Sequence, residues 1–139
     1  MDGRGSINNV PDHRKPIGNY GEQLVADWLV SKGHELIGRQ VRCRDGEIDL
    51  ITKDGQQIVF VEVKARLSTH CGSPEDAVTI SKQRRLTRLA LAYLKEHGLL
   101  EESARFDVVA LVLGESLEVV SRRHYEHAFE ASCRDSGLY

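Results

Sequence analysis

The sequence lacks any long hydrophobic run, and this absence excludes membrane-spanning and exported proteins from our expectations. No apolar stretch in the 139 residues approaches the roughly 18 residues that a transmembrane helix needs. The N-terminal residues 1–16 also lack the apolar segment of a signal peptide. We therefore expect a cytoplasmic protein without a membrane partner.

Cysteine is scarce as well. The three cysteines, Cys43, Cys71 and Cys133, are odd in number, far apart and free of CxxC spacing. They indicate neither a disulfide framework nor a zinc knuckle. We expect reduced thiols that pack inside the fold.

An excess of positive charge is also missing. The net charge of -2 argues weakly against a nucleic-acid partner, because proteins that bind nucleic acids are usually basic. The charges are unevenly distributed, however. Residues 39–88 hold ten basic against seven acidic residues, whereas the remainder holds nine against fourteen. A local positive surface can therefore exist on this acidic chain.

The length and composition fit one globular domain. A hydrophobic fraction of 40% and a charged fraction of 29% are typical of a globular, well-solvated protein with a single core. We expect a flexible arm at 1–16, one domain at 17–131 and a tail at 132–139.

The spacing of apolar residues predicts a helix, three strands, a second helix, and then one or two strands. The first helix is expected from a cap at Asn19 to about Lys32, and the second from a cap at Thr79 to about His97. A loop at 68–73 and a short helical turn after Pro74 come between them. The expected strands cover 35–43, 46–53, 56–65, 105–113 and 117–121.

The two strands around the turn dipeptide Asp54-Gly55 carry the candidate site. Side chains alternate along a strand, so Ile48, Leu50 and Thr52 are expected on one face and Asp49 on the other. With a two-residue or a four-residue loop, the side chains of Asp49, Glu62 and Lys64 emerge on a shared face. A three-residue loop would separate them.

Two neighbouring carboxylates repel each other unless a positive group lies between them. A divalent cation together with Lys64 would remove this conflict. Magnesium, for which manganese can substitute, takes hard oxygen ligands, which Asp49, Glu62, the backbone carbonyl of Val63 and water can supply. Such an ion supports phosphodiester hydrolysis. The alternative is the solvated face of an amphipathic hairpin with Lys64 paired to Glu62, although Phe60 on that face counts against it.

The segments GEIDLI and VFVEVKAR resemble the signature of the PD-(D/E)XK nuclease superfamily, with Asp49 as the aspartate and Glu62-Val63-Lys64 as the ExK. Further motifs resemble the YraN family of small bacterial proteins over about residues 18–130. These motifs are Gly21-Glu22, Gly46 to Ile51, Val59 to Arg66, Gly72 with Ala77-Val78, Lys82 to Arg85, and Arg105 to Val109.

The resemblance implies a Holliday-junction-resolvase-like fold, that is, a restriction-endonuclease-like core with a mixed central sheet flanked by helices in the order αβββαβ. It also implies an endonuclease that acts on DNA, with branched or damaged DNA among the candidates, and, by analogy with dimeric resolvases, a homodimer. At Gln40 the family more often has asparagine.

The resemblance adds Glu22 as a catalytic candidate near the metal, whereas a pair with a base such as Arg66 is the alternative. Glu47 is expected to pair with Arg44 or to hold the metal through water. The candidates for binding nucleic acid share a basic or amide side chain near the predicted site or in the second helix, where a solvated basic face is the alternative. They are Arg44, Arg66, Lys82, Gln83, Arg84, Arg85 and Arg88.

Two remaining groups are assigned to structure. Asp107 begins a buried strand and is expected to anchor an arginine. His124 and His127 have no third ligand nearby and are expected at the surface or in packing.

The leading function is thus a magnesium-dependent endonuclease, and the alternative is a non-catalytic nucleic-acid-binding module with a vestigial nuclease site. A small-molecule-binding protein lacks support because there is no GxGxxG, Walker loop or nucleophile elbow.

Overall fold

The computed structural model describes residues 14–69 and 78–131, which form two helices and a five-stranded sheet. The elements are, in chain order, α1 (Arg14–Ser31), β1 (Glu35–Cys43), β2 (Gly46–Asp54), β3 (Gln57–Leu67), α2 (Ile80–Glu96), β4 (Ala104–Leu113) and β5 (Val119–Phe129). The expected order αβββαβ is confirmed, and a fifth strand follows it.

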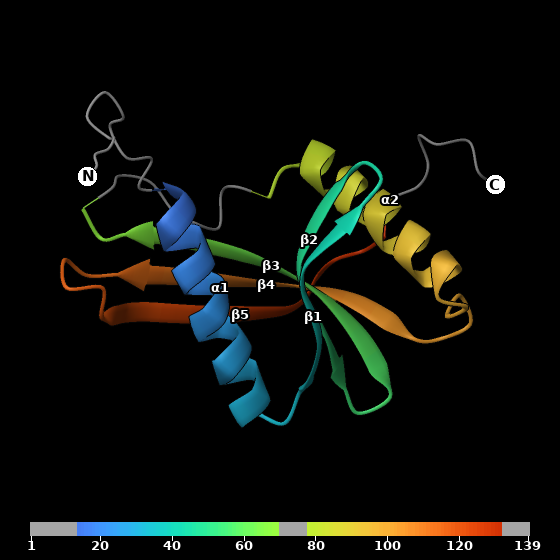
Figure 1. Ribbon diagram of the computed structural model, residues 1–139, viewed down its shortest axis with the longest axis horizontal. Helices are drawn as coiled ribbons and strands as arrows, with labels where there is room; N and C mark the ends of the chain where they lie inside the picture. Colours follow the sequence, from blue (N-terminus) through green and yellow to red (C-terminus); the bar gives the residue numbers. More distant parts are fainter. Residues whose placement is uncertain (1–13, 70–77, 132–139) are drawn as a thin grey trace, which may run out of the picture.

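The sheet is mixed, as predicted, with the strand order β1-β2-β3-β4-β5. All neighbouring strands are antiparallel except β3 and β4, which are parallel. A parallel pair requires a crossover connection, and α2 lies within it. Figure 1 shows α1 and α2 on opposite faces of the sheet.

Two separate apolar layers hold the helices on the sheet. Both draw on the alternation of β3, where Val59 and Val61 point toward α1 and Phe60 points toward α2. The layer under α1 also contains Val25, Ala26, Leu29, Leu50, Val109, Leu111 and Leu113. The layer under α2 also contains Ile48, Ile51, Ile58, Leu86, Leu89, Ala90, Tyr93, Leu94 and Phe106.

The hairpin between β2 and β3 closes one residue later than predicted. Asp54 pairs with Gln57, so the two-residue loop is Gly55-Gln56 rather than Asp54-Gly55. Gly55 has φ +64, a conformation that glycine adopts without steric cost at the first central position of such a turn. Continued by one pair, this register sets Asp49 opposite Glu62, which brings the two carboxylates closer than a diagonal placement would.

The predicted alternation along β2 fails at Asp49. Ile48 packs in the layer under α2, whereas Leu50 packs in the layer under α1, although both were expected on one face. Ile51 returns to the α2 side. The strand therefore shifts its facing by one residue at Asp49, which a strict period of two cannot predict.

The bounds of the other elements differ modestly from the predictions. The first helix begins at Arg14, before the expected cap at Asn19, while Gly33 with φ +103 follows its end as expected. Thr79 caps α2 as predicted by accepting a hydrogen bond from the Lys82 N–H at 3.2 Å. The last strand starts later than expected and runs on to Phe129.

Several predictions lie outside the described residues. They are residues 1–13 of the arm, residues 70–73 of the loop, the turn after Pro74, the tail at 132–139, and the thiols of Cys71 and Cys133. Within the described part of the chain, neither helix is long and apolar enough to cross a membrane.

Close packing of α1 on β3 depends on a glycine. A Cβ added to Gly21 would lie 2.6 Å from the Ala65 Cβ, far inside van der Waals contact, whereas one added to Gly18 would meet nothing within 4 Å. We expect Gly21→Ala to lower the free energy of unfolding by about 1–3 kcal/mol. Gly18→Ala should raise it by roughly 0.5–1 kcal/mol, because alanine favours helix. Urea unfolding of both variants measures the contrast, and equal effects would contradict this packing.

Candidate nuclease-type site

Asp49 lies where β2 and β3 part. The two strands pair from Asp54 and Gln57 as far as Leu50 and Val61. Beyond this point the Val63 N–H donates a hydrogen bond to the Asp49 carboxylate at 2.8 Å. The carboxylate thus satisfies the N–H group that would otherwise lack a strand partner.

Glu62 follows on β3 and faces two lysines. Its Oε2 atom lies 3.2 Å from the Lys64 Nζ and 2.9 Å from the Nζ of Lys82, which projects from the first turn of α2. The Glu62 side chain is 9% exposed and that of Lys64 is 19% exposed. The pair between Lys64 and Glu62 that a solvated hairpin face predicts is present. Both side chains are mostly buried, however, so these two residues do not belong to a solvated face.

Glu22 approaches the same place from α1. It is buried and accepts a hydrogen bond from the Gln40 Nε2 at 3.1 Å, and its carboxylate lies near that of Asp49. The base whose charge lowers the pKa of Glu22 is Arg39. The acidic groups of Glu22, Asp49 and Glu62 therefore approach one another from α1, β2 and β3.

Gln40 was missed as a contributor to this position. It sits on β1 with φ 48, and its side-chain amide also donates to Asn19 at 2.7 Å. Left-handed backbone is several-fold enriched in asparagine, which gives a physical reason for the asparagine that the resembling family more often has here. That family difference was the one signal in the sequence that could have pointed to this residue.

The pKa values of two of these carboxyl groups are raised. Burial, the nearby Glu62 carboxylate and Glu22 raise the pKa of Asp49 to about 8, although the Val63 N–H opposes the shift. Burial also raises the pKa of Glu22, against the hydrogen bond from Gln40. Asp49 and Glu22 therefore resist ionising together, and the positive charge of a bound cation would ease this.

The side chains of Lys64 and Lys82 lie next to each other and shift each other's pKa. Burial and the adjacent Lys82 lower the pKa of the Lys64 amine, against the attraction of Glu62. Burial opposes the charge on Lys82 too, but hydrogen bonds with Lys64 and Glu62 raise its pKa. Lys64 is therefore the amine that more readily gives up a proton.

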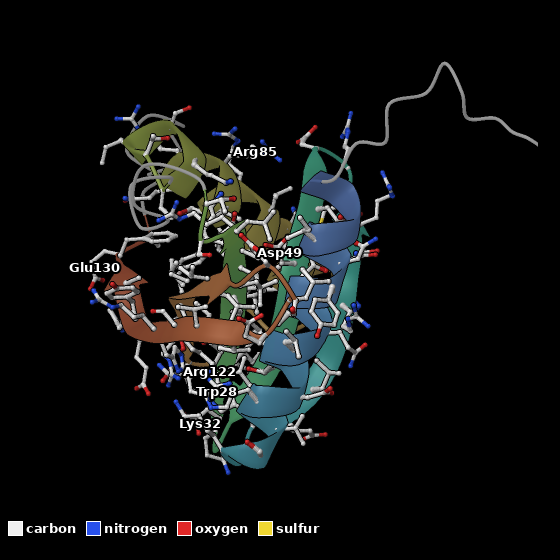
Figure 2. All side chains as sticks on the ribbon, turned by 90° about the vertical axis from the view of Figure 1, so that its left-hand side faces the viewer. Trp28, Lys32, Asp49, Arg85, Arg122 and Glu130 are labelled. Carbon is white, nitrogen blue, oxygen red and sulfur yellow. The ribbon has the colours of Figure 1, made fainter. Side chains whose placement is uncertain are left out.

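The remaining predicted residues belong to the turn between β1 and β2, to β3 and to α2. Arg66 continues β3, and Arg44 lies in the turn between β1 and β2. Gln83 donates to the Val78 carbonyl at 3.3 Å, so its amide serves the start of α2 rather than the acids. The exposed or half-exposed arginines of α2 are Arg84, Arg85 and Arg88, and Figure 2 shows Arg85 in the same half of the molecule as Asp49.

Two secondary predictions have different outcomes. Glu47 pairs with Arg42 at 3.5 Å rather than with Arg44, because the β1–β2 register sets Arg42 directly across from it. Asp107 anchors an arginine as predicted, with the Arg105 Nε donating to it at 2.9 Å.

His124 is confirmed in packing and His127 at the surface. The His124 side chain is only 5% exposed, and its Nε2 lies 2.7 Å from the Asp107 carboxylate. His127 is 53% exposed and pairs with Glu130.

Metal-ligand geometry is not preformed. Within residues 14–69 and 78–131, no three acidic, histidine or cysteine side chains are arranged to hold a metal ion. The reason lies in the contacts above, since Glu62 is turned toward Lys64 and Lys82, and Asp49 toward Val63. The donor set still suits a hard divalent cation, because it offers carboxylate oxygens, one of them on an acid that resists ionisation without a counter-charge.

Comparison with known proteins identifies relatives over most of the chain. The model of "Uncharacterised protein family UPF0102" matches residues 21–111. A UPF0102 protein from Geobacter metallireducens is 41% identical over 85% of this chain and 95% of its own length. One from Symbiobacterium thermophilum is 50% identical over 70% of this chain and 83% of its own length.

Among solved structures, SfsA from Pyrococcus furiosus in complex with Ca²⁺ is similar at a TM-score of 0.37 and 17% identity. The match covers 81% of this chain but only 63% of SfsA, so this chain spans less than two thirds of that protein.

Proposed function

The chain belongs to the UPF0102 family, and we propose that it is a metal-dependent endonuclease of the PD-(D/E)XK type that hydrolyses phosphodiester bonds in DNA. The observation that carries the proposal is the convergence of Asp49, Glu62 and Lys64 at the parting of β2 and β3. A fold has no structural need to bury repelling acids at one position, so their presence favours catalysis.

Asp49, Glu62 and the Val63 carbonyl are the proposed ligands of magnesium or manganese, with Glu22 beside them. When bound, the ion supplies positive charge to the phosphate and makes a coordinated water more acidic. The acids fit this role because burial and mutual repulsion hold the pKa of Asp49 at about 8 without a cation.

The residues of the chain itself perform the other tasks. Lys64 orients the attacking water or donates to a phosphate oxygen, and its lowered pKa suits either role. Lys82, which contacts Glu62 at 2.9 Å, would contact a phosphate oxygen in place of this carboxylate when substrate binds. The arginines of α2, with Arg66 and Arg44, would bind neighbouring phosphates, and the positive end of the α2 dipole supports them.

The second candidate is a nucleic-acid-binding module without catalysis. The observation that favours it is the 2.9 Å contact between the Lys82 Nζ and Glu62, since a lysine already neutralises the acid that a metal would need. Binding of DNA without cleavage in either magnesium or manganese would support this candidate.

The test is incubation of purified protein with linear, nicked, flapped and four-way DNA in magnesium or manganese. We expect cleavage that EDTA stops and that Lys64→Ala reduces by about 100-fold, because one preorganised donor to the reacting phosphate is lost. Single-turnover rates on labelled substrates measure the effect.

Lys95→Ala is the matched control, because Lys95 is an exposed lysine in the last turn of α2. It should cleave at the wild-type rate. Cleavage that persists equally in Lys64→Ala, or that survives EDTA, would reject the proposed site.

A further inference from the structure

A cationic cluster built on Trp28 lies away from the proposed active site. The Lys32 Nζ lies 4.3 Å from the centroid of the Trp28 ring, and the Arg122 guanidinium carbon lies 4.6 Å from it. Lys32 follows α1 and Arg122 belongs to β5, so two elements far apart in sequence deliver these charges to one indole. Figure 2 shows the three labelled residues together at one end of the molecule, with Asp49 nearer the other.

The cations are held in place without being neutralised. Within the described part of the chain, neither Lys32 nor Arg122 forms an ion pair with a carboxylate. The indole face attracts a cation through its quadrupole and carries no net charge. Both positive charges therefore stay available to an anion.

A chain of hydrogen bonds that leads from the surface into the fold orders Lys32 further. The Lys32 Nζ lies 2.9 Å from the His124 Nδ1, and the Nε2 on the other side of that ring lies 2.7 Å from the Asp107 carboxylate. Arg105 binds the same carboxylate through two atoms. The flexible lysine stem is thus fixed at its charged end, which lowers the entropy cost of binding a ligand there.

We propose that Trp28, Lys32 and Arg122 form a second nucleic-acid-binding patch, which binds a backbone phosphate of the substrate away from the cleavage centre. Two unneutralised cations at one point fit a phosphate, and an aromatic ring beside them is common where nucleic acids bind. The choice of nucleic acid as the partner rests on the proposed function.

The positions of Trp28 and Lys32 along α1 set the distance between the patch and the proposed active site. Trp28 and Lys32 come six and ten residues after Glu22, so they lie about 9 and 15 Å further along the helix direction at 1.5 Å per residue. Arg122 pairs with Leu111 in the β4–β5 ladder, on the sheet face that α1 covers. A nucleic-acid strand bound here would extend several nucleotides from the cleavage centre, so the patch favours substrates longer than a dinucleotide.

The chain offers a direct probe, because Trp28 is its only tryptophan. We expect a single-stranded oligonucleotide of about 12 nucleotides to quench Trp28 fluorescence saturably in EDTA, where no cleavage occurs. Free N-acetyltryptophanamide corrects for absorption by the DNA. Lys32→Gln combined with Arg122→Gln should weaken binding about 5- to 10-fold and reduce the salt slope of log K by about 1.4.

Lys95→Gln combined with Arg42→Gln removes the same charge elsewhere on the surface and is the matched control. It should retain the quenching curve of the wild type. The patch would be overturned if anisotropy showed that the oligonucleotide binds while Trp28 emission stays unchanged. It would also be overturned if the wild type bound no oligonucleotide, or if the Lys32 and Arg122 variant bound it as tightly as the wild type. Lys64→Ala should keep the quenching, so loss of cleavage and loss of the patch are separate results.

Discussion

Replacing Asp49 by asparagine is expected to abolish cleavage while making the protein more stable. Asparagine keeps the side-chain oxygen that accepts the Val63 N–H. It removes a buried charge that Glu62 and Glu22 repel. We expect the Tm in EDTA at about pH 9 to rise by about 2–4 °C, as a gain near 1 kcal/mol would give in a domain of this size.

The sign of the pH dependence follows from the raised pKa of Asp49. A carboxyl group whose pKa rises to about 8 on folding disfavours the folded state once it ionises, so wild-type stability falls as pH increases from its unfolded pKa of 3.8 through 8. The Tm difference between Asp49→Asn and wild type should therefore grow over this range. Differential scanning fluorimetry measures it, and a variant less stable than wild type would contradict the argument.

Metal binding gives this prediction a second readout. Magnesium or manganese should raise the Tm of the wild type, because a ligand that binds only the folded state stabilises it. The increase should be lost in Asp49→Asn. Asp27→Asn is the control, since Asp27 is an exposed residue of α1 and should retain the metal effect. An unchanged metal effect in Asp49→Asn would remove Asp49 from the proposed ligands.

The largest loss of stability is expected from Asp107→Ala. The Asp107 carboxylate is fully buried and receives hydrogen bonds from Arg105, from the ring of His124 and from the His127 N–H. Among the described residues, its removal leaves the guanidinium of Arg105, which is 8% exposed, with Asp54 and Gln57 as its remaining partners. Breaking a buried pair in this way costs about 3–5 kcal/mol, measurable by urea unfolding.

The contribution of Asp107 also depends on pH. The hydrogen bonds from His124 and Arg105 lower its pKa to about 2 against the effect of burial. A carboxylate with a depressed folded pKa stabilises the protein above its unfolded pKa of 3.8, and this stabilisation is lost as pH falls toward 2. The gap between wild type and Asp107→Ala should thus narrow by about 2 kcal/mol between pH 5 and pH 2. A gap that stays constant would contradict the role of the charge.

Much of the fold follows from local patterns in the sequence. Thr79 predicted the start of α2 because a threonine oxygen can cap the first N–H groups of a helix, and it does so here. The alternation from Val59 to Lys64 predicted which side chains of β3 share a face, because the side-chain period of a strand is two. The start of α1 was missed, since Asn19 is an equally good residue for a cap and for a contact with Gln40.

The candidate site was predicted in part. Asp49, Glu62 and Lys64 were identified from residue type and spacing, and Glu22 from the resemblance. The contact between Lys82 and Glu62 depends on how α2 packs over the sheet. The role of Gln40 depends on a left-handed residue in β1, a conformation that no local pattern specified.

The sequence by itself determined which acids and amines the chain carries, and which strand brings Glu62 and Lys64 to one face. These are consequences of covalent order and a fixed side-chain period. Only the tertiary structure decided that Asp49 stands at the parting of two strands, that Glu22 reaches it, and that Lys32 and Arg122 meet at Trp28. Such contacts arise because helix packing and strand register join residues far apart in the chain, and both depend on the whole core.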